Sequence, residues 1–229
     1  MRAPARLAAH HYGLQQEWQG KMARHDIPLG FVGGATRLAC GLYAATPVLT
    51  AFGWRRMAEL APGDLVLTGE TGLAAVRAIR PDLRAALWSV LVPPGSLGNE
   101  TAILLPPGQP VLIESRFALP FCGEAVALVP ATALEGWRGI TSHVPPQPEP
   151  ILHIRLARPG TIFAGPGLRA GIDGTTDSPF DLARLLQAPF RTKLPLAAAR
   201  HLVASLIAEE AGQSLYQSQA AALRAPNRP

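Results

Sequence analysis

The chain has 229 residues, of which 48% are hydrophobic and 16% are charged, and its formal net charge is +5. This composition supports a sizeable buried core and excludes a chain that is disordered over most of its length. The 22 glycines and 23 prolines favour short strands joined by many turns over long helices.

The basic charge raises the question of an anionic partner. The 21 lysines and arginines are scattered along the chain, and no basic run is interleaved with aromatic residues. Nucleic-acid-binding domains usually gather their basic residues on one face or along one element. We therefore expect no nucleic-acid partner, and a basic nucleic-acid-binding β module is the weakest alternative.

The cysteines, histidines and apolar stretches limit which other classes of protein this chain can belong to. Cys40 and Cys122 are too few for a disulfide framework, and no CxxC pair indicates a zinc ribbon. The six histidines are spread out, so we expect neither a metal nor another cofactor. No apolar stretch is long enough for a signal peptide or a transmembrane helix. The default is a soluble, cytoplasmic protein without a membrane partner, although a C-terminal export signal would escape this argument.

The predicted elements, in chain order, begin with a polar leader over residues 1–36, which we expect to be partly helical or disordered. Residues 37–172 are predicted to form an all-β body, because apolar runs recur about every ten residues with turn signals between them. Two short helical interruptions are expected within this body. The predicted strands are 46–51, 64–69, 73–80, 87–93, 102–106, 110–115, 125–131 and 151–157, with a ninth candidate at 161–165, and the interruptions are 55–60 and 131–134.

Residues 173–229 are predicted to be a helical C-terminal extension. A short helix is expected after Asp177 or Ser178, either of which can cap its N-terminus. Residues 195–224 are expected to form one or two helices with a break at Gly212 and an approximate apolar stripe. This stripe must be buried against the β body or against a second copy of the chain, so self-association through the helix is an alternative.

The β body also carries a set of short motifs. TPVLT (46–50) is followed by GWRRMAEL (53–60), by GDLVLT (63–68) and by GLAAVR (72–77). In order and spacing these motifs resemble the opening of the Hint (hedgehog/intein) family, in particular its bacterial subfamily, and the resemblance extends over residues 37–172. It implies a Hint-like, horseshoe-shaped β body with short C-terminal helices.

Some motif residues have structural explanations that need no chemistry. Pro62, Gly63 and Asp64 can turn the chain and begin the following strand. We expect Trp54 to be a large apolar anchor that packs over the body.

The resemblance also implies where catalytic residues would stand. In active Hint domains an opening Cys or Ser attacks the preceding carbonyl in an acyl shift, and a histidine protonates the departing amide nitrogen. In this sequence Gly41 and Gln109 occupy the nucleophile and histidine positions. Glycine has no side chain, and glutamine cannot be protonated near neutral pH. We therefore expect no catalytic residue and a degenerate site.

Cys40, one residue before the nucleophile position, is the alternative nucleophile. A one-residue shift turns a side chain to the opposite face of a strand, although a bulge near Gly41 restores its direction. A small cysteine in such a segment is more often a core residue. A dyad of Cys40 with His143, in a proline-rich loop, or with His153, on a strand, is the form that a catalytic site would take.

Two further segments are interpreted structurally. The acidic residues of 173–181 lack the spacing of an EF-hand, so a capped helix start is expected, and the glycines of 165–171 lack a nucleotide-binding pattern, so a turn is expected. Glu209 and Glu210 are expected on a solvated helix face unless they are paired.

The leading hypothesis is a Hint-like module without self-splicing or self-cleavage that acts as a scaffold or binding module for an unknown protein or peptide. The alternative is an autoprocessing domain that cleaves the peptide bond before Cys40 or Gly41.

Overall fold

The structure is a computed structural model that describes residues 38–82, 86–145, 149–172 and 191–224. The described residues belong to one compact unit. The expected leader (1–36) and the expected short helix after Asp177 or Ser178 lie outside the described residues.

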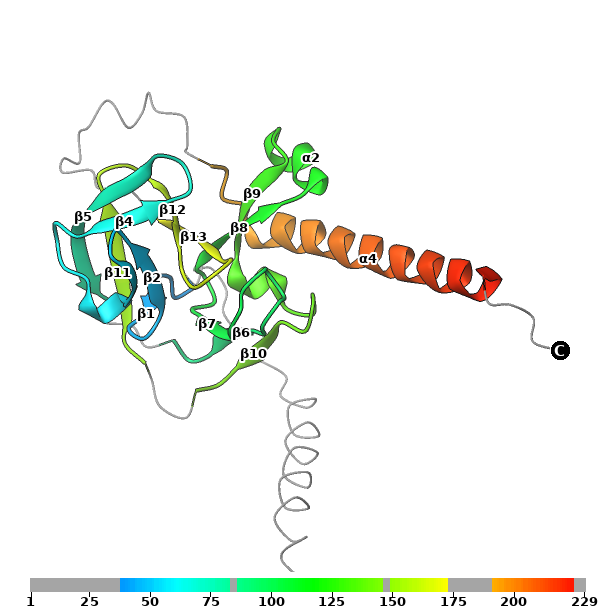
Figure 1. The fold of residues 1–229 in the computed structure, drawn as a ribbon, viewed down its shortest axis with the longest axis horizontal. Helices are drawn as coiled ribbons and strands as arrows, with labels where there is room; N and C mark the ends of the chain where they lie inside the picture. The colour runs from blue at the N-terminus through cyan, green and yellow to red at the C-terminus, as the bar shows by residue number, and fades with distance from the viewer. Residues whose placement is uncertain (1–37, 83–85, 146–148, 173–190, 225–229) are drawn as a thin grey trace, which may run out of the picture. The chain divides into compact units, whose positions relative to one another are not determined.

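Antiparallel strands make up nearly all of the body, which confirms the all-β prediction (Figure 1). The larger sheet has ten strands in the order β1-β11-β5-β4-β12-β13-β8-β9, with β2 paired to both β3 and β4, and a smaller sheet has the order β10-β6-β7. The strands are β1 (Leu42–Tyr43), β2 (Pro47–Thr50), β3 (Gly53–Arg56), β4 (Leu65–Thr68), β5 (Gly72–Pro81), β6 (Ser89–Val92), β7 (Ile103–Leu105), β8 (Pro110–Glu114), β9 (Val126–Pro130), β10 (Thr141–His143), β11 (Ile151–Leu156), β12 (Gly160–Phe163) and β13 (Arg169–Ile172).

The burial of the strands follows the side-chain period of two. On β2 and β4 the residues Val48, Thr50, Val66 and Thr68 are buried, while their neighbours are partly or fully exposed. On β6 and β9 burial is nearly continuous, as expected for strands that are covered on both faces. The largest fully buried apolar side chains of the core are Leu42, Met57, Leu105, Leu134, Ile140, Ile151, Leu156, Ile162, Leu168 and Leu202.

Each of the nine predicted strand ranges overlaps an observed strand, but four short strands were missed: β1, β3, β10 and β13. The interruption predicted at 131–134 is confirmed as the 3-10 helix η3 (Ala131–Leu134). The one predicted at 55–60 is shorter, because its first residues extend β3 and only η1 (Met57–Glu59) is helical. The segment 165–171 begins with a turn closed by the bond from the Leu168 N–H to the Gly165 carbonyl, and then continues into β13.

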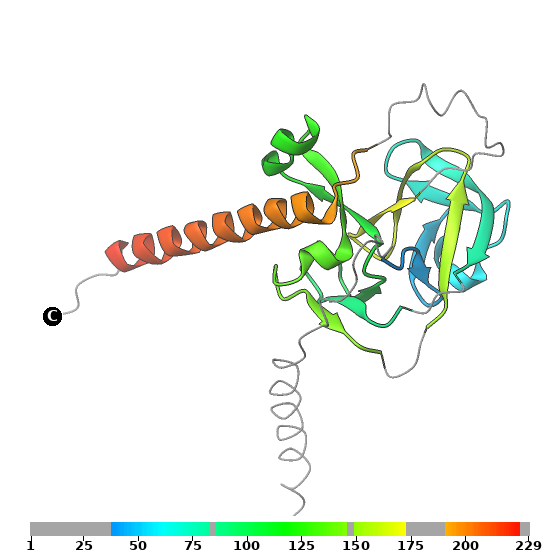
Figure 2. The same cartoon turned by 180° about the vertical axis from the view of Figure 1, so that it is seen from behind.

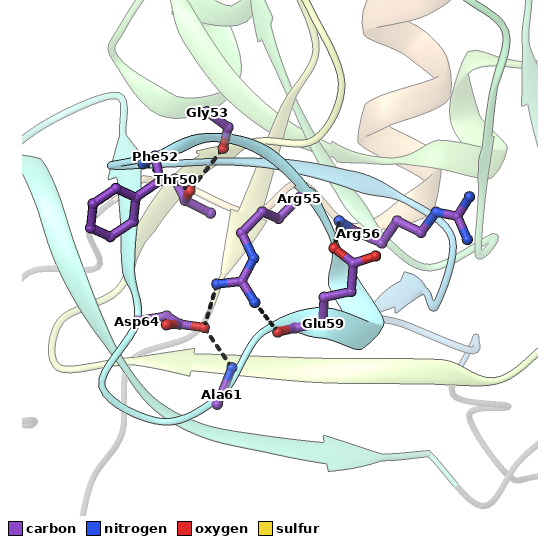
Figure 3. Close-up of polar contacts among 8 residues, drawn as sticks. All are labelled: Thr50, Phe52, Gly53, Arg55, Arg56, Glu59, Ala61 and Asp64. Atoms are coloured by element: carbon purple, nitrogen blue, oxygen red, sulfur yellow. Dashed lines mark hydrogen bonds and ion pairs between the residues drawn. The ribbon is translucent and has the colours of Figure 1, made fainter.

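The most specific family motif builds a loop (Figure 3). Arg55 donates to the Asp64 carboxylate, with Nη1 and Oδ2 3.2 Å apart, and to the carbonyl oxygen of Glu59. Asp64 Oδ2 also accepts the Ala61 N–H at 2.8 Å, and the Asp64 N–H donates to the Ala61 carbonyl at 3.1 Å. The turn predicted around Gly63 is therefore confirmed, and Arg55 and Asp64 are explained by folding rather than by chemistry.

The expectation that Trp54 packs as an apolar anchor was wrong. Trp54 lies on β3 directly opposite Leu49 of β2, and 43% of its surface is exposed. Its strand pairs with β2 alone and so lies at the border of the sheet. The buried side of this region is filled instead by Val48 and Met57.

The C-terminal part is one helix, α4 (Leu196–Arg224), of 29 residues. Of the two forms predicted for residues 195–224, one helix or two, the structure shows one, and it continues through the possible break at Gly212, since a glycine inside a helix costs only about 1 kcal/mol relative to alanine. Its first turns contact η3, β9 and the 3-10 helix η2 (Arg116–Ala118). Residues 211–214 are exposed, and Figures 1 and 2 show the helix extending away from the strands there.

The first half of α4 buries an apolar face against the β body, the first of the two predicted locations, although Ile207 of the predicted stripe is 40% exposed. Ala199, Leu202, Val203 and Leu206 are all buried there. Nonpolar burial of this kind supplies most of the stability of a helix in a protein.

Polar contacts hold the same helix at the end of its fourth turn. Glu209 pairs with Arg116 at 2.6 Å, and Glu210 pairs with Arg138 at 2.6 Å while accepting the indole N–H of Trp137 at 3.1 Å. These two glutamates are therefore paired and do not form a simple solvated face. Because Trp137 is buried, its bond to Glu210 fixes the helix more firmly than the exposed ion pairs do.

The turn that joins β12 to β13 depends on close backbone approach. Gly167 has a φ of +83°, and a Cβ atom there would lie 1.9 Å from the Gly98 carbonyl oxygen. Gly95 has a similar φ of +81° but open space around the position of its Cβ. Substitution at Gly95 would therefore measure the cost of a left-handed backbone alone, and substitution at Gly167 would add the cost of a steric clash.

We predict that Gly95→Ala lowers the free energy of unfolding by about 1–2 kcal/mol, the cost of a left-handed non-glycine residue. Gly167→Ala should cost at least about 2 kcal/mol more, because the backbone of Gly98 must move. Denaturant unfolding of both variants measures the difference. Equal losses would show that the two loops do not touch as described.

Candidate functional site

The two positions that the family resemblance singles out lie in direct contact. Gly41 comes just before β1, and Gln109 comes just before β8. The Gly41 N–H donates to Gln109 Oε1 at 3.0 Å, although 68 residues separate them in sequence. Gln109 is almost completely buried, with 1% of its surface exposed. The structure thus brings the predicted nucleophile and histidine positions together, with neither reactive side chain present.

The hydrogen bonds of Gln109 fix the direction of its amide. Nε2 donates to the carbonyl oxygens of Pro110 at 3.0 Å and Gly171 at 2.9 Å. An inverted amide would place its oxygen against both carbonyl oxygens and its N–H group against the Gly41 N–H. Gln109 therefore acts as an acceptor toward Gly41 and as a donor toward β8 and β13.

Position 41 has no room for a side chain. Gly41 has a φ of +122°, a conformation that favours glycine. A Cβ atom there would lie 2.7 Å from Ile151 Cγ2 and 2.8 Å from the Leu152 carbonyl oxygen, both on the neighbouring strand β11. A cysteine or serine at this position would require β1 and β11 to separate.

Cys40 lies at the same junction, partly buried rather than in the core as expected. Its Sγ is 3.8 Å from Gln109 Oε1, the distance of a weak S–H···O contact. The carbonyl of Ala39, which a Cys40 thiol would attack, accepts the Gly108 N–H at 2.7 Å. The Gln109 oxygen instead faces the amide of Gly41, one peptide bond further along.

The two candidate histidines have other neighbours. His153 Nε2 lies 3.1 Å from Asp82 Oδ2 and is half-exposed. His143 lies on β10, opposite Ser89 of β6, so its predicted place in a loop was wrong. The Cys40 thiol contacts the Gln109 amide.

A second buried polar pair lies next to the junction. The Tyr43 hydroxyl, on β1, is 2.6 Å from Ser89 Oγ, on β6 of the smaller sheet. Burial raises the pKa of Tyr43 above its ordinary value, the hydrogen bond with Ser89 opposes this, and Glu149 raises it further. Tyr43 therefore keeps its proton at neutral pH and joins the two sheets through a neutral bond.

Residues 38–82, 86–145, 149–172 and 191–224 contain neither a metal-binding cluster nor a membrane-spanning helix. No cluster of three or more His, Cys, Asp or Glu side chains is placed to hold a metal ion in this part. No helix within these residues is long and apolar enough to cross a membrane.

Sequence reasoning identified Gln109 but not what it contacts. Its acceptors are the carbonyls of Pro110 and Gly171, and Ala39 is held by the N–H of Gly108. These are main-chain groups, which every residue carries, so the sequence does not indicate which of them Gln109 contacts.

Comparison with known proteins gives one family. A family model described as the Hint domain matches residues 40–168. No curated protein matches the chain. Among solved structures, a bacterial intein-like domain from Clostridium thermocellum is 14% identical, with 58% of this chain and 99% of that one covered and a TM-score of 0.44. The Msm DnaB1 intein splicing domain bound with zinc is 19% identical, with 58% and 100% covered and a TM-score of 0.39.

We predict that Gln109→Leu destabilises the protein by at least about 3 kcal/mol, because it leaves one N–H and two carbonyls of the buried junction without partners. The matched control is Gln213→Leu on the exposed part of α4, which should change stability by less than about 0.5 kcal/mol. Denaturant unfolding compares the two. A small effect at position 109 would mean that its amide is not bonded as described.

Proposed function

The chain belongs to the Hint domain family, and we propose that it is a Hint module without self-cleavage whose body is a scaffold for binding a protein or a peptide. The observation that carries this proposal is the buried amide of Gln109, with its oxygen on the Gly41 N–H.

The acyl shift of the family needs two groups that this junction does not offer. A nucleophile must stand on the residue after the attacked carbonyl, and Gly41 has neither a side chain nor space for one. A proton must reach the departing amide nitrogen. Gln109 presents an acceptor to that nitrogen, and both of its own N–H groups are used on carbonyls.

Retention of the fold-building contacts supports a scaffold role. The Arg55–Asp64 pair and the buried valines of β2 and β4 use the family motif to build a loop and a core. A module that keeps these contacts and replaces the reactive groups by a satisfied amide preserves its body rather than its chemistry. Binding is the function that such a body can still perform.

One observation favours the alternative, cleavage through Cys40. The Gly108 N–H on the Ala39 carbonyl is placed where a donor would stabilise an oxyanion formed by attack of the Cys40 thiol. This attack still lacks an acid, because Gln109 cannot protonate the nitrogen of Cys40. Experiment must therefore separate the two candidates.

We predict that the purified chain keeps its intact mass during prolonged incubation, with and without hydroxylamine or dithiothreitol, which cleave thioesters. Gln109→His should also stay intact, because the imidazole alone supplies no nucleophile at position 41. Mass spectrometry of both proteins measures this.

Cys40→Ala is the matched control for the same experiment. A fragment that begins at residue 40 or 41 in the unsubstituted chain, and that disappears in Cys40→Ala, would overturn the proposal and establish the autoprocessing alternative.

A further inference from the structure

Four neighbouring strands bring large apolar residues into one row on the side of the sheet opposite the core. Trp54 of β3 is paired with Leu49 of β2, and Leu67 of β4 is paired with Leu73 of β5. The register of β2 with β4 places Leu49 opposite Leu67. Directly opposed residues share a face, so these four residues form a continuous line, here named the apolar row.

The apolar row is open to solvent at both ends. Trp54 is 43% exposed and Leu73 is 50% exposed, and the two leucines between them are partly exposed. Leu65, beside the row on β4, is 41% exposed, and Phe52, in the turn before β3, is 90% exposed. Single exposed apolar residues are common, but a contiguous line of them is typical of an interaction surface.

Arginines border the apolar row at two corners. Arg56 lies two residues after Trp54 on β3, and Arg77 lies two residues after Ala75 on β5, so alternation places both on the face of the row. Both are exposed. Among the described residues, neither arginine forms an ion pair with a carboxylate.

The carboxylates of the same strands and loops have partners already. Asp64 is bonded to Arg55 and to the Ala61 N–H, as Figure 3 shows. Glu59 accepts the main-chain N–H at position 56, and Glu70 accepts both the hydroxyl and the N–H of Thr161. Arg55 therefore has a carboxylate partner, whereas Arg56 and Arg77 present guanidinium groups with which no carboxylate of the described residues forms an ion pair.

The charges on this face help to distinguish three possible partners: a second copy of the chain, a lipid surface and a protein segment. A second copy of the same face would bring like charges together, which is unfavourable at an interface. A lipid surface offers negative charge, but the two middle leucines are less exposed than Trp54 and Leu73. Contact with all four residues requires side chains that reach the sheet between its exposed ends, and a protein segment supplies such side chains.

We propose that this face binds a protein segment that places apolar side chains on the apolar row and carboxylates beside Arg56 and Arg77. The inference rests on the binding role proposed above and names its surface and the chemistry of its partner. It does not depend on the absence of self-cleavage.

A displayed library of random peptides, selected against the full chain, tests the proposal. Enriched peptides should combine apolar residues with Asp or Glu. Their dissociation constants, measured by fluorescence anisotropy with synthetic peptides, should rise at least about tenfold for Trp54→Ala and for Arg77→Glu.

Two matched variants control for general loss of an exposed group. Leu87→Ala removes an 87% exposed leucine outside the four strands, and Arg200→Glu reverses an exposed charge on α4. Both should leave peptide affinity unchanged. Thermal unfolding of each variant confirms that it remains folded.

Several results would overturn the inference. These are a library without enriched peptides, a consensus without acidic residues, or affinities that Trp54→Ala and Arg77→Glu leave unchanged. Binding to phosphatidylserine vesicles that both variants abolish, without peptide selection, would assign the face to a lipid surface instead. The intact mass of the same samples reports on self-cleavage separately, so each proposal fails by its own measurement.

Discussion

A buried side-chain amide whose oxygen and both N–H groups are hydrogen-bonded holds the start of the first strand against two other strands of the sheet. Gln109 accepts from Gly41 and donates to the carbonyls of Pro110 and Gly171. Inside a protein such a network is strong when complete and costly when one partner is missing. These bonds link the start of β1 to β8 and β13, in addition to the ladders of β1 with β11 and of β13 with β8.

The same network bears on the proposal that this chain does not cleave itself. An amide resists attack because its nitrogen shares electron density with the carbonyl. The Gln109 oxygen accepts from the Gly41 N–H and so favours this undisturbed planar amide, whereas cleavage requires a proton on the nitrogen. At the same junction, Gly41 has a conformation that favours glycine, and it packs closely against β11.

The sequence predicted those features that depend on neighbouring residues and missed those that depend on residues far apart in the chain. Apolar runs located nine strands, because long buried strands carry their own pattern, and motif spacing located Gln109. The missed strands β1, β3, β10 and β13 have two to four residues, and three of them carry charged or polar residues, so their pairing partners decide their structure. α4 continues through Gly212 because the small propensity cost of a glycine does not outweigh the hydrogen bonds of a long helix. The exposure of Trp54 depends on which strand ends the sheet. The hydrogen bonds of Gln109 could not be predicted from the sequence, because its partners are main-chain atoms.

Amide hydrogen exchange at Gly41, measured by NMR, tests the central claim most directly. Its N–H lies against a buried acceptor, so we predict exchange that is slow and approaches the rate set by global unfolding. Exchange near the rate of an unstructured peptide would contradict the account, because it would show that the amide of Gln109 does not hold this junction.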